Sequence, residues 1–301
     1  MSQEAVARSA AIAAKKKFNW QLWGLLFVLP EIIIFLMFLW IPIVKGVVYS
    51  FYNVDFVNGN SFVGLQNYRD VVSSEDFWMA IRNTLYYMFL CVIIGFWVPA
   101  VVAIAVSELK RFQGLARVAG YLPSVIPAIV LYGMWVWFYD PIGPINTMLT
   151  SLGLEQIDFF SKGMSMVSIV IMETWQNFGG AVLIYIAAIV GIPKDLYEAA
   201  EIDGASVWQR IRSITLPSMK PLLILMFLLQ IINTSQSFQA QMAMTGGGPD
   251  NATLTYLLLM YREAFTYLHF GKATAMGSML FGVMVVLSFL YLKLQRRSET
   301  A

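Results

Sequence analysis

The chain has 301 residues, of which 58% are hydrophobic and only 13% are charged, and its mean hydropathy is +0.67. Soluble domains carry about 25% charged residues, so this composition indicates a membrane protein. The net charge of +2 is too small to indicate a nucleic-acid partner. The single cysteine, Cys91, leaves no basis for an internal disulfide framework or a cysteine-based metal site.

The first apolar segment follows three consecutive lysines at 15–17, a pattern that also occurs in secretory signals. We favour a retained spanning helix, because the apolar run exceeds the about 7–15 residues of a signal core and no small-residue cleavage site follows it. Residues 1–19 are therefore expected to form a cytoplasmic tail. Residues 298–301 are expected to form a second one.

Six apolar segments are long enough to cross a bilayer, whose core of about 30 Å needs about 20 residues in a helix. They cover residues 22–44, 83–106, 118–139, 164–192, 221–242 and 273–292, and their only charged side chains are Glu31 in the first and Glu173 in the fourth. Lipid offers no partner to backbone groups, so spanning helices are expected. The predicted fold is an all-α membrane domain of six transmembrane helices over residues 20–297.

The basic residues predict the orientation of these helices. With a cytoplasmic N-terminus, 14 of the 20 Lys and Arg residues lie on the cytoplasmic side, and the other six are Lys45, Arg69, Arg82, Lys162, Arg262 and Lys272. Cytoplasmic loops carry an excess of Lys and Arg. Both termini are therefore expected in the cytoplasm.

Three connections are expected on the outer side. The alternation of apolar and polar groups around 62–68 is typical of a short helix on the membrane surface. The Asp140–Pro144 segment, with two prolines and a glycine, predicts a turn. Three successive glycines in 245–251 predict the most flexible stretch of the protein.

The cytoplasmic connection 193–217 has the composition of two short helices. Pro193 suits a first helical turn, Gly204 suits a left-handed helix end, Ser206 suits the cap of a second helix, and Pro217 is expected to end that helix. The first helix is acidic and the second is basic. Periodicity alone leaves two interpretations open, a surface that docks another protein and an amphipathic loop lying on the bilayer.

A resemblance favours the docking surface. The loop is similar to the cytoplasmic E-A-A motif of permease subunits in bacterial ATP-binding-cassette importers, and the residues that match at its spacing are Glu198, Ala199, Ala200, Gly204, Ile214, Leu216 and Pro217. Asp203 matches the fuller form of the motif, whereas Ile211 stands where phenylalanine is usual. The resemblance implies that these residues couple the chain to an ATPase.

Residues 62–68, Asn83–Thr84, the turn at 137–146 and residues 245–249 resemble carbohydrate importers of the maltose, oligosaccharide and glycerol-3-phosphate type. Such a permease sits in the bacterial cytoplasmic (inner) membrane. Its implied partners are a second homologous permease, favoured as a different chain, two cytoplasmic ATPases, an extracytoplasmic solute-binding protein and a carbohydrate. No phosphate-binding G-x-x-x-x-G-K-[ST] loop occurs, since Gly271–Lys272 lacks the earlier glycine. We therefore expect no cofactor and no enzymatic activity here, with ATP and Mg bound by the partner ATPases.

Polar side chains on spans four and five are candidates for the substrate path. In span five, Gln230, Asn233, Thr234, Ser237 and Gln241 lie on one face of the predicted helix, with Gln236 and Gln239 beside it. Such a stripe either bonds neighbouring helices or lines a hydrophilic path, and so many amides favour the path. Phe178, Gln236 and Ser237 fall near sugar-site positions of the resembled maltose permease. The predicted path is Trp175, Asn177, Phe178, Asn233, Gln236 and Ser237.

Three isolated ionisable residues have simpler interpretations. Glu173 could couple proton movement to transport, but its place near the outer end of span four favours contact with interfacial water. Glu31 adjoins Pro30, where a bent helix can accommodate it. His269, the only histidine, is favoured as an interfacial residue over a metal ligand.

The leading hypothesis is a non-enzymatic permease subunit of an ATP-driven oligosaccharide importer. A self-sufficient ion-coupled sugar carrier is the second, and it needs an inverted repeat and paired intramembrane charges that the sequence does not clearly contain. A membrane-embedded enzyme is the third, but no nucleophile and base lie at a shared depth. A glycerol-3-phosphate or polyol solute stays open, although span five has no basic residue for a phosphate.

Overall fold

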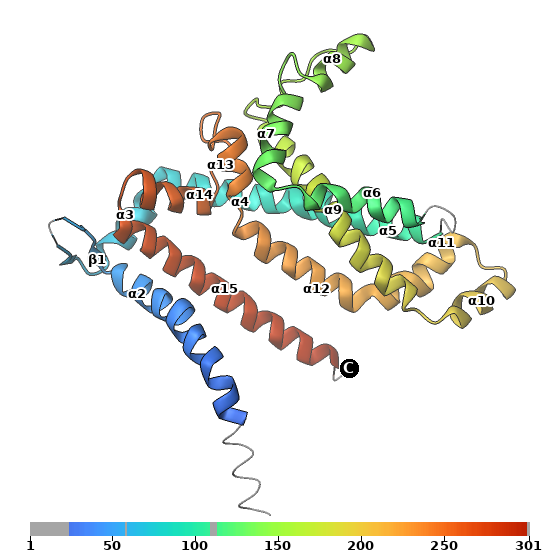
Figure 1. Cartoon of the computed structure of the whole chain (residues 1–301), viewed down its shortest axis with the longest axis horizontal. Helices are drawn as coiled ribbons and strands as arrows, with labels where there is room; N and C mark the ends of the chain where they lie inside the picture. Colours follow the sequence, from blue (N-terminus) through green and yellow to red (C-terminus); the bar gives the residue numbers. More distant parts are fainter. Residues whose placement is uncertain (1–23, 58, 109–112, 300–301) are drawn as a thin grey trace, which may run out of the picture. The chain divides into compact units, whose positions relative to one another are not determined.

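The computed structural model describes residues 24–57, 59–108 and 113–299, so the predicted tail at 1–19 lies outside the described residues. The chain divides into two compact units. Figure 1 shows the whole chain, coloured from blue at the N-terminus to red at the C-terminus. Unit 1 contains the described residues up to Val71 and those from His269 onward, and unit 2 is Val72–Leu268.

Among the described residues, five helical segments are long and apolar enough to cross a membrane: Gly24–Tyr49, Glu75–Ser107, Ser165–Val190, Val207–Ser235 and Phe270–Phe289. The expectation of a mostly helical membrane fold is confirmed. Residues 118–139, however, do not form one helix. They are divided between α6 (Gln113–Val125) and α7 (Ala128–Phe138), because Pro127 is extended at ψ 130° and disfavours a helical conformation for the residue before it.

Unit 1 consists of two long helical segments and the connection that follows the first. Gly24–Tyr49 includes a π-helical turn, η1 (Leu36–Trp40), and α2 (Ile41–Tyr49), which packs against α15 (Phe270–Glu299). The connection forms a two-stranded antiparallel hairpin, β1 (Tyr52–Asn53) and β2 (Ser61–Phe62), followed by α3 (Gln66–Ser73). The helix expected around 62–68 therefore begins only at Gln66, after Gly64 reverses the chain at φ +58°.

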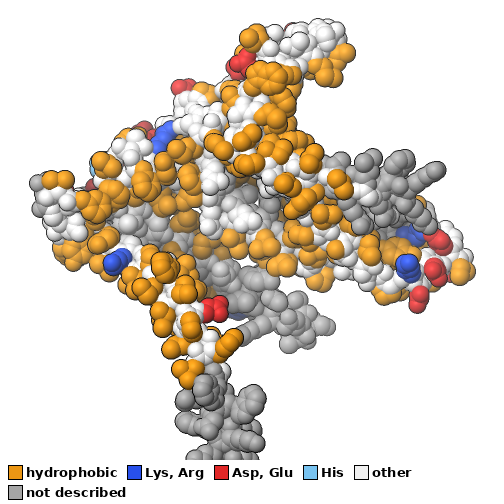
Figure 2. Space-filling view, in the orientation of Figure 1, with side chains coloured by type: hydrophobic (Ala, Val, Ile, Leu, Met, Phe, Trp, Pro, Cys, Tyr) orange, Lys and Arg blue, Asp and Glu red, His pale blue; other side chains and the backbone are white. Residues whose placement is uncertain are grey.

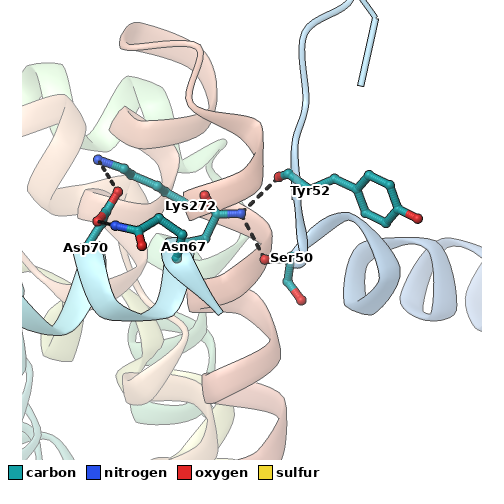
Figure 3. Close-up of polar contacts among 6 residues, drawn as sticks. Ser50, Tyr52, Asn67, Asp70 and Lys272 are labelled. Carbon is teal, nitrogen blue, oxygen red and sulfur yellow. Dashed lines mark hydrogen bonds and ion pairs between the residues drawn. The ribbon is translucent and has the colours of Figure 1, made fainter. Parts of the chain in front are cut away.

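Asn67 ties the start of α3 to the end of α2 and to β1. Its buried Nδ2 donates hydrogen bonds of 2.9 Å to the carbonyl oxygens of Ser50 and Tyr52, as Figure 3 shows. Both acceptors are backbone groups outside a helical ladder, which need a partner when they are buried. One amide thus satisfies two of them and fixes the entry to the hairpin.

The first turn of α15 lies against the same place. Gly271 adjoins the Tyr52 carbonyl so closely that an added Cβ would overlap it and lie 2.7 Å from Asn67 Nδ2. Next to it, Lys272 Nζ lies 3.7 Å from the Asp70 carboxylate (Figure 3). Position 271 therefore requires a residue without a side chain.

Unit 2 contains helices throughout. Glu75–Ser107 is one segment built from α4 (Glu75–Leu90), the π-helical η2 (Cys91–Phe96) and most of α5 (Trp97–Glu108). After α6 and α7 come α8 (Pro144–Ser151), α9 (Ser165–Val190), α10 (Lys194–Ile202), α11 (Val207–Arg210), η3 (Ile211–Thr215), α12 (Leu216–Ser235), α13 (Gln239–Thr245), α14 (Tyr256–Tyr261) and η4 (Arg262–Thr266).

The centre of unit 2 is α9, which packs against α4, α5, α6, α7, α12 and α13. At its crossing with α6, Gly179 faces Gly120. A Cβ on Gly179 would overlap the Gly120 carbonyl and the Tyr121 Cα. Small residues allow this close approach of two backbones, as is typical of helix pairs in membranes.

We predict that Gly271→Ala destabilises unit 1, since the added methyl group overlaps a backbone carbonyl and displaces the Asn67 amide. Overpacking of this kind costs about 1–3 kcal/mol. Thermal unfolding of the detergent-purified chain measures it, with Gly282→Ala on the same helix as control, because a methyl group added there meets no atom within 4 Å. Equal unfolding midpoints for the two variants would contradict the close packing of Gly271 against the Tyr52 carbonyl.

We predict that Gly179→Ala separates α9 from α6, while Gly180→Ala, one residue along the same helix, has open space around it and leaves the fold intact. The overlap at 179 is with backbone atoms, which cannot rotate away as a side chain can. The measurement is the fraction of monodisperse protein after extraction. It should fall only for Gly179→Ala, and equal yields would rule out the close crossing.

Candidate functional site

The connection between α10 and α11 has a fixed backbone conformation. Gly204 has φ +74°, the Gly204 N–H donates to the Glu201 carbonyl, and the Ala205 N–H donates to the Ala200 carbonyl. These two bonds form the Schellman end of a helix, which favours glycine at this position. The predicted left-handed conformation of Gly204 is confirmed.

Ser206 begins the second helix, as predicted. Its Oγ accepts from the Gln209 N–H, and the Gln209 side chain accepts from the Ser206 N–H in return. This reciprocal capping box satisfies two N–H groups at the helix start. The direction of α11 after the glycine turn is thereby set by the sequence.

The prediction that Pro217 ends the second helix is wrong. The helix runs without interruption from Val207 to Ser235 and includes α11, η3 and α12. Pro217 lies at the start of α12, directly after the π-helical turn, where the hydrogen-bond ladder shifts and a missing N–H is tolerated. The basic helix of the loop is therefore the beginning of the fifth predicted span.

Two side-chain contacts hold α10 against this helix. Arg210 forms an ion pair with Glu201, and the Tyr197 hydroxyl lies 2.9 Å from Thr215 Oγ1. Arg210 is mostly buried by the contact, with its side chain 14% exposed. The loop is thus a preformed structure in the isolated chain.

The matched motif residues differ in exposure. Glu198, Ala199, Asp203, Gly204 and Pro217 are exposed, and Ala200, Ile214 and Leu216 are partly buried. Beside them, Ile202 and Trp208 are 87% and 68% exposed. Figure 2 shows charged side chains gathered at the end of unit 2 formed by α10 and α11. Apolar side chains among exposed carboxylates form a surface suited to a protein partner.

The predicted fifth span is not helical to Met242. It breaks after Ser235, and residues Gln236 to Phe238 separate α12 from α13. The expected single polar face therefore ends at the break. Asn233 and Gln236 are exposed there, and Ser237 turns inward.

The three predicted path residues of α9 point in different directions. Trp175 packs edge-on against Trp135 of α7, with ring centroids 5.5 Å apart. Phe178 lies against the cluster of α5, α9 and α12 and near Gly120. Asn177 is exposed, and its amide donates to the Glu173 carbonyl. Only Asn177 lies beside the polar groups described next.

A polar cluster joins α4, α9 and the α12–α13 break. Tyr87 donates a hydrogen bond to the Glu173 carboxylate, and Ser237 Oγ lies 3.2 Å from Tyr87 Oη and 3.4 Å from Glu173 Oε1. Gln241 Oε1 is 3.4 Å from the same Ser237 hydroxyl, and its buried Nε2 has no hydrogen-bond partner among the described residues. The structure thus brings Ser237, predicted to line the path, to a carboxylate.

Tyr87 is absent from the residues predicted to line the path, and Glu173 was expected mainly to contact interfacial water. A signal for Tyr87 was present, because Asn83, Tyr87 and Cys91 recur every four residues and share one face of the α4–η2 segment, and all three are buried. A polar face buried within a span indicates contact with other polar groups.

The glycine-rich segment 245–251, predicted to be the most flexible stretch, is hydrogen-bonded by side chains from other parts of unit 2. Arg262 donates to the Gly246 carbonyl and to Asn251 Oδ1, and Thr253 donates to the Gly248 carbonyl. Asn83, a distant residue in α4, donates to the carbonyls of residues 251 and 254. The glycines permit positive φ at 246 and 247 in a fixed turn.

Residues 92–300 match the family described as the binding-protein-dependent transport system inner membrane component. The chain belongs to this family. Its members are transport components of a membrane, and the matched region includes the E-A-A loop and both sides of the α12–α13 break.

Individual relatives agree over nearly the whole length. The chain is 31% identical to the trehalose/maltose transport system permease protein MalF of Thermococcus litoralis, covering 95% of this chain and 97% of that one. It is 33% identical to the diacetylchitobiose uptake system permease protein NgcF of Streptomyces coelicolor, covering 78% and 71%. The structure matches a chain of a bacterial alginate ABC transporter, in complex with an alginate pentasaccharide-bound periplasmic protein, with TM-score 0.83 and 26% identity over 94% and 96% of the two chains.

Proposed function

We propose that this chain is one of two homologous permease subunits in an ATP-driven, binding-protein-dependent importer of a carbohydrate, most simply an oligosaccharide. The observation that carries the proposal is the exposed, preformed E-A-A loop at the end of unit 2 in a chain of the binding-protein-dependent family. Named relatives that act on trehalose, maltose and diacetylchitobiose support a sugar as the solute.

The proposed arrangement places residues 20–297 in the bacterial cytoplasmic membrane as six spans, with both termini and the 193–217 loop in the cytoplasm. Residues 118–139 would form the third span through the combined α6 and α7. Two separate ATPases bind ATP and Mg, and a solute-binding protein delivers the sugar from outside. This chain itself needs no cofactor and catalyses no reaction.

The continuous helix Val207–Ser235 supplies the mechanical connection. Movement of the ATPases pushes α10 and α11 through the exposed Glu198, Asp203 and neighbouring apolar side chains. Because α11, η3 and α12 are one helix, the displacement reaches the break at Gln236–Phe238 without an intervening loop. The proposed consequence is that the polar groups at the break move between outward-facing and inward-facing positions.

We predict that Gly204→Val uncouples ATP hydrolysis from uptake, whereas Gly204→Asn does not. A β-branched residue is strained at φ +74°, by about 1–2 kcal/mol or more, while asparagine adopts this conformation readily. A Cβ added at this position has no atom within 4 Å, so the effect of valine comes from the backbone. Sugar transported per ATP hydrolysed in proteoliposomes measures it, and normal coupling in the valine variant would refute the role of the loop.

We predict that Gln236→Ala changes the apparent affinity or sugar selectivity of uptake by about 10-fold without changing assembly, since it removes an exposed amide at the helix break. The substitution Gln156→Ala, which removes an exposed amide outside the predicted path and the 193–217 loop, is the matched comparison and should leave the kinetics of uptake unchanged. Identical kinetics for Gln236→Ala over a panel of oligosaccharides would remove Gln236 from the path.

A further inference from the structure

Glu173 is the only charged residue of α9, and it lies about 12 Å from the start of that helix. Its side chain is partly exposed and contacts Tyr87 and Ser237, at the point where α12 breaks. Asn177, one turn further, is exposed and bonded to the Glu173 backbone. A carboxylate therefore stands among the groups assigned to the substrate path.

No basic residue balances this carboxylate. Residues 83–107, 118–139 and 221–249, which supply the parts of α4 to α7, α12 and α13 that surround α9, contain no charged side chain at all. Within the described part of the chain, Glu173 forms no ion pair, and its side-chain partners are hydroxyl groups. An intramembrane carboxylate is costly to keep, so one without a cation needs a functional explanation.

We propose that Glu173 selects solutes by charge, so that the path accepts neutral and amine-bearing sugars and rejects uronates and sugar phosphates. This inference rests on the proposed function. A carboxylate accepts hydrogen bonds from sugar hydroxyl or ammonium groups, whereas an anionic sugar meets it acceptor to acceptor. Two unit charges about 6 Å apart, at an effective dielectric constant of about 20, repel enough to weaken binding roughly 100-fold.

The fold itself does not impose this selection. A structural relative of closely similar fold belongs to a transporter of alginate, which is an acidic polysaccharide. Selection by solute charge within this fold therefore has to come from side chains along the path. In this chain that side chain is Glu173, which is acidic.

The test is equilibrium binding to the assembled transporter in lipid nanodiscs, without the solute-binding protein, so that only the membrane site is measured. Saturation-transfer NMR compares maltotriose, its 6-carboxylate derivative and its 6-amino derivative. The wild type should bind the carboxylate roughly 100-fold more weakly than maltotriose. In Glu173→Gln this difference should shrink to less than about 5-fold.

Two further variants separate charge from structure. Tyr87→Phe removes the hydrogen bond to Glu173 and keeps the carboxylate, so it should keep the discrimination. Glu75→Gln removes an exposed carboxylate at the start of α4 and should behave as the wild type. If Glu173 only holds helices together, Glu173→Gln weakens binding of all three sugars in the same ratio, and that result would overturn the inference.

Equal wild-type binding of the neutral and anionic sugars would also overturn it, independently of whether any variant folds, and would leave the importer function standing. Binding of none of the three sugars by the wild type would instead count against a carbohydrate solute. That result would overturn both the proposed function and the charge selection.

Discussion

The hydrocarbon core of a membrane offers no hydrogen-bond partner to a backbone N–H or C=O group, and this constraint explains most of the structure. Long helices satisfy these groups internally, so a helix that stops within the core needs polar partners nearby. At the α12–α13 break, the N–H groups of Gln236 and Ser237 bond to the carbonyls of Asn233 and Thr234. Thr255 donates to the Ser237 carbonyl. Backbone groups at the break are thus paired by neighbouring carbonyls and by one threonine hydroxyl.

The same requirement explains why polar side chains gather in this region. Tyr87, Glu173 and Ser237 bond one another across three elements. These groups stabilise the break and also supply donors and acceptors at the only interruption of the long helix Val207–Ser235 and its continuation within the described residues.

Features fixed by local chemistry were predictable from the sequence. The apolar runs predicted where long helices occur but not all of their bounds, and the Gly204 turn and the Ser206 cap follow from conformational preferences of single residues. The prediction for Pro217 was wrong, because a π-helical turn before it absorbs the missing hydrogen bond, and short sequence windows do not show such a turn. The bonds that Asn83 makes to the carbonyls of residues 251 and 254 were not predictable, because Asn83 lies far away in the sequence.

In the candidate path, too, the sequence predicts which residues are polar but not which residues they contact. Helical periodicity assigned Ser237 to a face of a continuous helix, but it lies beyond the end of α12. Trp175 and Phe178, three residues apart on α9, meet α7 and the α6 crossing. The partners of Glu173 come from residues separated from it by 86 and 64 positions, and no local pattern pairs them. Side-chain contacts on a helix with several neighbouring helices are decided by packing, which only the folded unit specifies.

The helix α9 meets three different requirements within 26 residues. At Gly179 it needs the absence of a side chain, because the α6 backbone passes there, and at Glu173 it needs a polar group beside the helix break. At its end it leads directly into the connection that carries the E-A-A motif. Two helices therefore connect the 193–217 loop with the polar cluster: α9, which carries Glu173, and the Val207–Ser235 segment, which ends at the break.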